Sequence, residues 1–184
     1  MPNQASIVGI CAATLPRANF GPRWTSANEE DRFAIAFSGA YDRQFCAIHK
    51  GTTKFNRAMA REVPVNGFGI ADLVTVSWGE SAVPTMRAFE LKLSDWRRGL
   101  MQAHRYRFFA DVAILVVPVS KIAIIDRFMR TFKALNVGLW GFDEATGIIS
   151  QIFTPRPRRP PDRGHHEKAI ARVLATAKQF QPPP

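Results

Sequence analysis

The chain has 184 residues, 46% of them hydrophobic, which is enough for one domain with a sizeable core. Its 25 Lys and Arg residues outnumber 15 Asp and Glu residues, and the resulting net charge of +10 favours a polyanionic partner, with nucleic acid the leading candidate. Two cysteines without CxxC spacing exclude a disulfide scaffold and favour a reducing, cytoplasmic compartment. A basic protein without a nucleic-acid role remains the alternative.

Residues 1–27 are expected to form an N-terminal extension packed on the core. Residues 6–15 are apolar, but no basic segment precedes them and they are too few to span a bilayer, so we expect no membrane role.

The first predicted helix starts with a capping box, Ser26 followed by Glu29. Its core-facing stripe at helical spacing consists of Phe33, Phe37, Tyr41, Phe45 and Ile48. Counting back along this stripe places Glu30 on the inward face. An acid at this point is equally well explained by the favourable dipole at a helix N-terminus.

A hairpin is predicted next, because Asn66-Gly67 separates two apolar segments, residues 63–65 and 69–78. Asp72 lies in the second segment, among apolar and small neighbours typical of a strand buried on both faces. A carboxylate in such a strand is costly unless a partner satisfies it.

Residues 85–93 form the next predicted strand. Alternation places Phe89, Leu91 and Leu93 on one side, and Glu90 and Lys92 on the other. Carboxylates at the ends of adjacent strands, here Asp72 and Glu90, are hard oxygen ligands suited to Mg²⁺ or Mn²⁺. A lysine beside such a metal can orient the attacking water or offset charge on a phosphate.

A helix capped by Ser94 or Asp95 follows this strand at once. Gln102 and Tyr106 are four residues apart and therefore share one helical face. The other faces carry arginines that we expect to contact a phosphate backbone, namely Arg97, Arg98, Arg105 and Arg107.

The rest of the chain completes an α/β pattern. We expect a buried strand at residues 111–118, a helix from Ser120 to Leu135, a strand at 137–142 and a hairpin to 148–153. Residues 154–164 are rich in Pro and Arg and predict an extended arm before a final helix to Phe180. The arginines of this arm that could contact phosphates are Arg156, Arg158 and Arg159.

The chain carries, in this order, Asp72, Glu90-Leu91-Lys92 on an apolar strand, and a helix with Gln102 and Tyr106. This series resembles the motifs of the PD-(D/E)XK nuclease superfamily. The helix is similar to the QxxxY element of its exonuclease-like and resolvase-like branches. The chain departs from the pattern in having Ala71, and not proline, before the aspartate.

The resemblance implies a restriction-endonuclease-like fold, a mixed central sheet flanked by helices, over residues 28–153, with 154–184 as linker and helix. It implies Mg²⁺ or Mn²⁺ held by Asp72, Glu90 and the backbone carbonyl of Leu91, with Lys92 positioning water. It also implies substrate support from Gln102 and Tyr106, and an extra acidic residue from the first helix, for which Glu30 is the candidate.

The expected activity is phosphodiester hydrolysis, in DNA first, while RNA stays open as a substrate. The alternative is a binding module of the same fold within a larger assembly, although the complete Asp, Glu and Lys set argues against it. Cutting two strands would suit a homodimer. The sequence contains no glycine-rich phosphate loop and no GxSxG elbow, and its four histidines lack zinc spacing.

Overall fold

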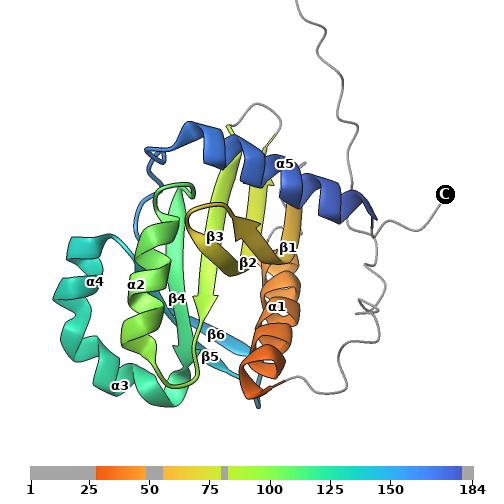
Figure 1. Cartoon of the computed structure of the whole chain (residues 1–184). Coiled ribbons are helices and arrows are strands. Elements are labelled where there is room, and N and C mark those ends of the chain that lie inside the picture. The colour runs from red at the N-terminus through yellow and green to blue at the C-terminus, as the bar shows by residue number, and fades with distance from the viewer. Residues whose placement is uncertain (1–27, 49–55, 80–82, 180–184) are drawn as a thin grey trace, which may run out of the picture.

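The structure, a computed structural model, describes residues 28–48, 56–79 and 83–179. The predicted N-terminal extension and the cap at Ser26 lie outside these residues. A mixed six-stranded sheet with helices on both faces forms the body of the protein (Figure 1). The predicted α/β architecture is therefore confirmed.

The six strands are neighbours in the sheet in the order in which they occur along the chain. The first three form an antiparallel meander, the third to fifth are parallel, and the last is antiparallel. Their bounds are β1 Asn56–Val65, β2 Gly69–Trp78, β3 Thr85–Leu91, β4 Val112–Pro118, β5 Gly138–Asp143 and β6 Ile148–Phe153.

One long helix covers one face of the sheet, and the other helices cover the opposite face. The helices are α1 Glu29–Ile48, α2 Trp96–Tyr106, α3 Ile122–Ile125, α4 Met129–Leu135 and α5 Arg163–Gln179. The alternate residues of β4 show this division, because Ile114 packs with α1 while Leu115 packs with α2 and α4. None of the described helices is long and apolar enough to cross a membrane.

Helix α1 begins later than the capping box predicts. The side chain of Asn28 accepts a hydrogen bond from the backbone N–H of Asp31 at 2.9 Å, so Asn28 is the N-cap. The predicted stripe is confirmed for Phe33, Phe37 and Tyr41, which are buried against the sheet.

The prediction of a single helix from Ser120 to Leu135 is wrong. The chain forms α3 and α4 with short 3₁₀ turns before each, and Ser120 lies in the first of these turns. Asn136 ends α4 in the left-handed conformation at φ 52°. The connection from β4 to the parallel β5 is nevertheless helical, as a crossover requires.

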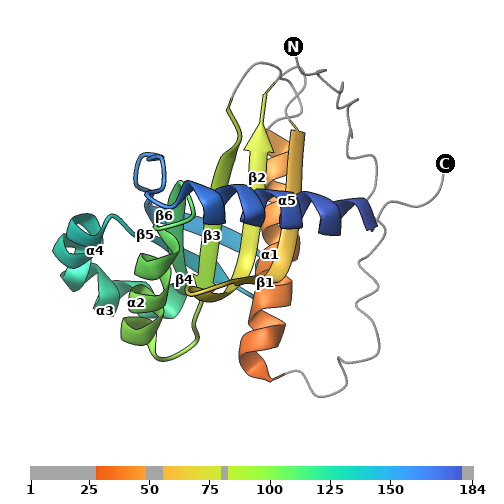
Figure 2. The ribbon, with the colours of Figure 1, turned by 45° about the horizontal axis from the view of Figure 1, so that its top comes forward.

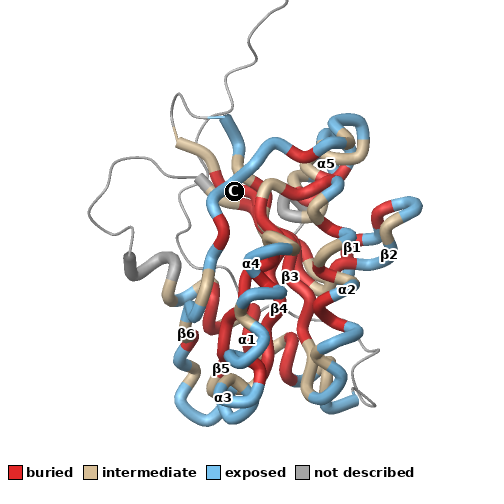
Figure 3. Tube along the Cα trace, turned by 90° about the vertical axis from the view of Figure 1, so that its left-hand side faces the viewer, coloured by how far each residue is buried: buried red, intermediate tan, exposed pale blue. Residues whose placement is uncertain are grey.

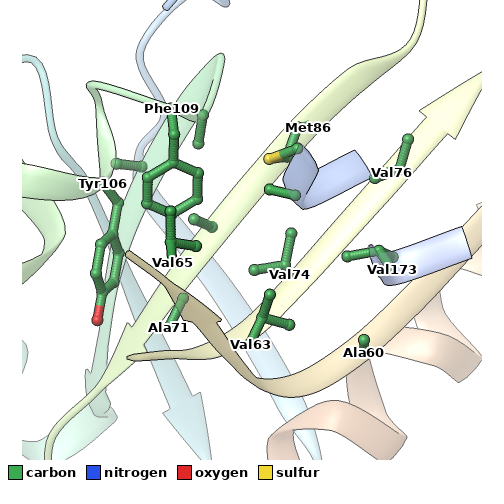
Figure 4. Close-up of a cluster of buried hydrophobic side chains, with 14 of the residues drawn as sticks. Ala60, Val63, Val65, Ala71, Val74, Val76, Met86, Tyr106, Phe109 and Val173 are labelled. Carbon is green, nitrogen blue, oxygen red and sulfur yellow. The ribbon is translucent and has the colours of Figure 1, made fainter. Parts of the chain in front are cut away.

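The buried residues lie along the strands and on the inner faces of the helices, and the exposed ones lie on the outer faces of the helices and in the turns (Figure 3). Helix α5 crosses β1 and β2 (Figure 2) and adds Ala169 and Val173 to a cluster that also contains Val74 and Tyr106 (Figure 4). The C-terminal helix is thus part of the same hydrophobic core as the sheet.

The β1–β2 hairpin is bent near its middle. Arg61 pairs with Leu73 and Val63 pairs with Ala71, which leaves Glu62 and Asp72 as the unpaired positions between them. Glu62 has φ 51°, a left-handed conformation that is uncommon for a residue with a side chain. This bend interrupts the alternation of β1 next to Asp72.

Candidate metal and phosphate site

The candidate site lies where β2 and β3 diverge. The hydrogen-bonded pairing of the two strands ends at Leu73 and Phe89, so the residues beyond this pair are released from the ladder. Asp72 and Glu90 are the next residues on the two strands. The sheet therefore opens between the two predicted carboxylates.

Asp72 bridges this opening to β3. Its Oδ2 accepts a hydrogen bond from the backbone N–H of Leu91 at 2.7 Å. Burial raises the pKa of Asp72, and Glu30 adds to the rise, while the Leu91 N–H and the Lys92 ammonium oppose it. In a strand the N–H and C=O of one residue point to the same side, so the Leu91 carbonyl lies on the side of Asp72.

Glu90 is sealed inside the protein, with 1% of its surface exposed. Its Oε2 lies 2.5 Å from the hydroxyl of Tyr106, which also lies 2.7 Å from the carbonyl oxygen of Ile70. One phenol hydrogen cannot satisfy both acceptors. A proton on Glu90 would resolve this, because the carboxyl could donate to Tyr106 while Tyr106 donates to Ile70. Burial, reinforced by Asp72, raises the pKa of Glu90 to about 7, and so favours this proton.

Tyr106 lies beside the site as predicted, but it is 1% exposed. Figure 4 shows its ring at one margin of the apolar cluster, with the hydroxyl directed away from Phe109. The phenol therefore holds the carboxylate of Glu90 and cannot contact a large substrate. Burial, followed by the charge of Glu90, raises the pKa of Tyr106, which keeps the hydroxyl protonated.

Lys92 extends to the same side as Glu90. Its Nζ lies 3.1 Å from Glu90 Oε1 and 3.5 Å from Glu30 Oε2. Burial alone would lower the pKa of Lys92, but the attraction of Glu90, Asp72 and Glu30 outweighs it and raises the pKa above its usual value. Lys92 is therefore a cation at neutral pH.

Glu30 reaches the site from the first turn of α1. Besides its contact with Lys92, its Oε1 accepts a hydrogen bond from the Leu93 N–H at 3.5 Å. The carboxylate is 43% exposed, unlike that of Glu90, and so lies at the opening of the site. A cleft of about 70 Å³ begins here. The cleft is lined by Asn28, Glu30, Asp31, Ala34, Arg61, Glu62, Asp72, Leu91 and Lys92.

The predicted phosphate-contacting arginines lie elsewhere on the described surface, and none of them lines this cleft. Arg97 stacks over Trp96, with 4.5 Å from its guanidinium carbon to the ring centroid. Arg107 donates a hydrogen bond to the Leu135 carbonyl at 2.8 Å, and burial, with the nearby charge of Arg158, lowers its pKa. The exposed members of the set are Arg97, Arg98, Arg105, Arg156, Arg158 and Arg159.

Gln102 does not join the hydrogen bonds around Glu90. Its Oε1 is buried and has no hydrogen-bond partner among the described residues. The helical spacing places Gln102 and Tyr106 on one face, but only Tyr106 contacts a predicted site residue. The substrate role of Gln102 stays a prediction.

Arg61 is a residue of the cleft that the sequence patterns did not reveal. The charges of Glu62, Asp31 and Asp72 act on it, although burial dominates and lowers its pKa. The hairpin register could have indicated it, because Arg61 pairs with the neighbour of Asp72. The register depends on the length of the turn, however. The chain has three residues between the paired Val65 and Gly69, and a two-residue turn would give a different register.

The donor set fits a magnesium-like ion. No three His, Cys, Asp or Glu side chains of the described residues gather closely enough to hold a metal by themselves. Mg²⁺ commonly takes only one or two carboxylates and completes its shell with water and substrate phosphates. Asp72, Glu90 and the Leu91 carbonyl would supply such a partial set, and the raised pKa values of both acids show that their negative charges are incompletely compensated.

No protein-family model and no curated protein matches the chain. Among solved structures, a protein of unknown function from Silicibacter pomeroyi is similar, with a TM-score of 0.49 and 14% sequence identity over 77% of this chain and 84% of that one.

Titration of Glu90 should make the stability of the metal-free protein depend on pH. Because the pKa of Glu90 rises from 4.5 to about 7, the folded protein binds a proton that the unfolded chain has lost. The contribution of Glu90 to the free energy of unfolding should be fully present below pH 4.5 and be lost as pH rises through about 7. Chemical denaturation of the wild type and of Glu90→Gln in EDTA at several pH values measures this contribution. If the free energy of unfolding varied with pH in the same way for the two proteins, the prediction would be contradicted.

Lys92 depends on a glycine of α2 for its position. A Cβ at Gly99 would lie 2.6 Å from Lys92 Cγ and 2.8 Å from Leu115 Cδ1. We expect Gly99→Ala to displace Lys92 and to lower the free energy of unfolding by about 1–3 kcal/mol. Gly39→Ala in α1 is the matched control, because among the described residues its Cβ would meet Arg43 Nη1 at 3.4 Å and nothing closer. Replacing this helical glycine should raise the free energy of unfolding by about 0.5–1 kcal/mol. Equal stability changes in chemical denaturation would show that the contact is unimportant.

Proposed function

We propose that the protein is a divalent-metal-dependent nuclease that hydrolyses phosphodiester bonds, with DNA as its substrate, on a restriction-endonuclease-like core. The observation that carries the proposal is the convergence of Glu90 and Lys92 at 3.1 Å, beside an Asp72 that bonds to the backbone between them.

In this proposal Asp72, Glu90 and the Leu91 carbonyl hold the metal. When bound, a divalent cation supplies positive charge that polarises the phosphate and lowers the pKa of water. Tyr106 keeps the Glu90 carboxylate in place from the interior. Glu90 must lose its proton to act as a metal ligand, and its pKa of about 7 makes that loss inexpensive at neutral pH.

Lys92 acts as a cation and not as a base, because its pKa is raised. It would orient the attacking water and offset negative charge that develops on the phosphate. The water oxygen bonds to phosphorus as one ester P–O bond breaks. The water loses a proton to solvent through the open side of the cleft near Glu30, and the departing oxygen takes up a proton.

Support for nucleic acid comes from charge. The chain carries a net charge of +10, and the arm after β6 presents Arg156, Arg158 and Arg159 to solvent. The backbone N–H of Arg158 donates to the Asp111 carbonyl at 3.0 Å, which fixes the arm beside the start of β4. Exposed arginines of this kind supply sequence-independent contacts to phosphates. We place this activity in the cytoplasm, because the sequence has two cysteines without CxxC spacing, which suits a reducing compartment.

Purified protein incubated with plasmid and linear DNA should cut in Mg²⁺ or Mn²⁺ and not in EDTA. Lys92→Ala and Asp72→Asn should each lower the rate by about 100-fold or more, because Lys92 would offset charge on the reacting phosphate and Asp72 would hold the metal that does the same. Lys133→Ala, on an exposed face of α4, is the matched control and should cut like the wild type.

Unchanged cleavage by Lys92→Ala would remove the proposed mechanism. Retention of DNA by the wild-type protein without cleavage in either metal would identify the chain as a binding module.

A further inference from the structure

The candidate cleft contains a second cation. Its lining residues include two positively charged side chains, Lys92 from the end of β3 and Arg61 from β1. Lys92 is held between Glu90 and Glu30, at 3.1 and 3.5 Å. Arg61 approaches from the β1–β2 hairpin, so the two cations reach the cleft from different strands.

We propose that Arg61 holds a non-bridging oxygen of the phosphate that the site cleaves. This inference rests on the proposed function and assigns a substrate-contacting role to a residue outside the Asp72, Glu90 and Lys92 set. A guanidinium suits the task, because its planar N–H donors match the oxygens of a phosphate and it keeps its charge when buried.

The strand geometry directs Arg61 to this position. Arg61 is paired with Leu73, the residue next to Asp72, and is followed by Glu62 in the left-handed conformation. A left-handed residue with a side chain is energetically costly, and such residues concentrate at functional sites. The bend at Glu62 lies one residue from Arg61 and directly opposite Asp72.

The charges of the cleft also favour this role. Glu30, Asp31, Glu62, Asp72 and Glu90 are acids in or beside the cleft, against the two cations Arg61 and Lys92. A divalent cation bound to Asp72 and Glu90 would compensate part of this excess. The phosphate that enters with it then needs a donor besides Lys92, and Arg61 is the other cation among the described residues that line the cleft.

The experiment compares Arg61→Ala and Arg61→Lys with the wild type in two assays. The first measures kcat and KM for DNA cleavage in Mn²⁺, and the second measures the shift in melting temperature that Mn²⁺ produces without DNA. Arg32→Ala is the matched control, because it removes the same charge from an exposed position on α1.

Arg61→Ala should lower kcat by about 100-fold with little change in KM. Its Mn²⁺-induced shift should equal or exceed that of the wild type, because loss of a cation leaves the acids more available to metal. Arg61→Lys should fall between the two, since it keeps the charge and loses the planar donors. Arg61→Lys also tests the inference if Arg61→Ala does not fold.

Cleavage by both Arg61 variants at the rate of Arg32→Ala would overturn the inference. The inference would also be overturned if the Arg61 variants lost both cleavage and the Mn²⁺-induced shift in melting temperature. Arg61 would then be organising the acids and not binding phosphate. A wild-type protein that shows no cleavage is a different result, which refutes the nuclease proposal on which this role depends.

Discussion

The burial of Glu90 is the constraint on which the rest of the site depends. A carboxylate with 1% exposure must be protonated or paired, and here the Lys92 ammonium and the Tyr106 hydroxyl lie against its two oxygens. Lys92 directly follows the end of β3, whereas Tyr106 is the last residue of α2. The site thus couples the end of β3 to the packing of α2, and Gly99 permits the close approach of that helix to Lys92.

A second consequence of this arrangement is an excess of negative charge at the open end of the sheet. Asp72 and Glu90 both have raised pKa values, which means that their ionised forms lack full compensation in the protein alone. A binding partner that brings positive charge would relieve both groups at once. A divalent cation does so, and a phosphate bound to that cation would then lie in the cleft that Lys92 and Arg61 also line.

The sequence predicted the parts of the site that depend on backbone periodicity. Glu90 and Lys92 share a side because side chains alternate along a strand, and Glu30 faces inward because a helix repeats every 3.6 residues. It did not predict Arg61, because the bend at Glu62 uses a left-handed residue without the Gly or Asn that would signal it. It also predicted one helix where α3 and α4 form, since apolar spacing persists across the 3₁₀ turn between them. Tyr106 was placed on the correct helical face, but its burial follows from the packing of α5 and the β1–β2 hairpin, which are distant in the sequence.

The most direct measurement is an anomalous difference map from crystals of the protein grown with Mn²⁺. The account predicts one strong peak bonded to the carboxylates of Asp72 and Glu90 and to the carbonyl of Leu91, with Lys92 released from Glu90. Crystals of Asp72→Asn grown in the same way should lack the peak. A wild-type map with no peak at this position, or with manganese bound only elsewhere, would contradict the account.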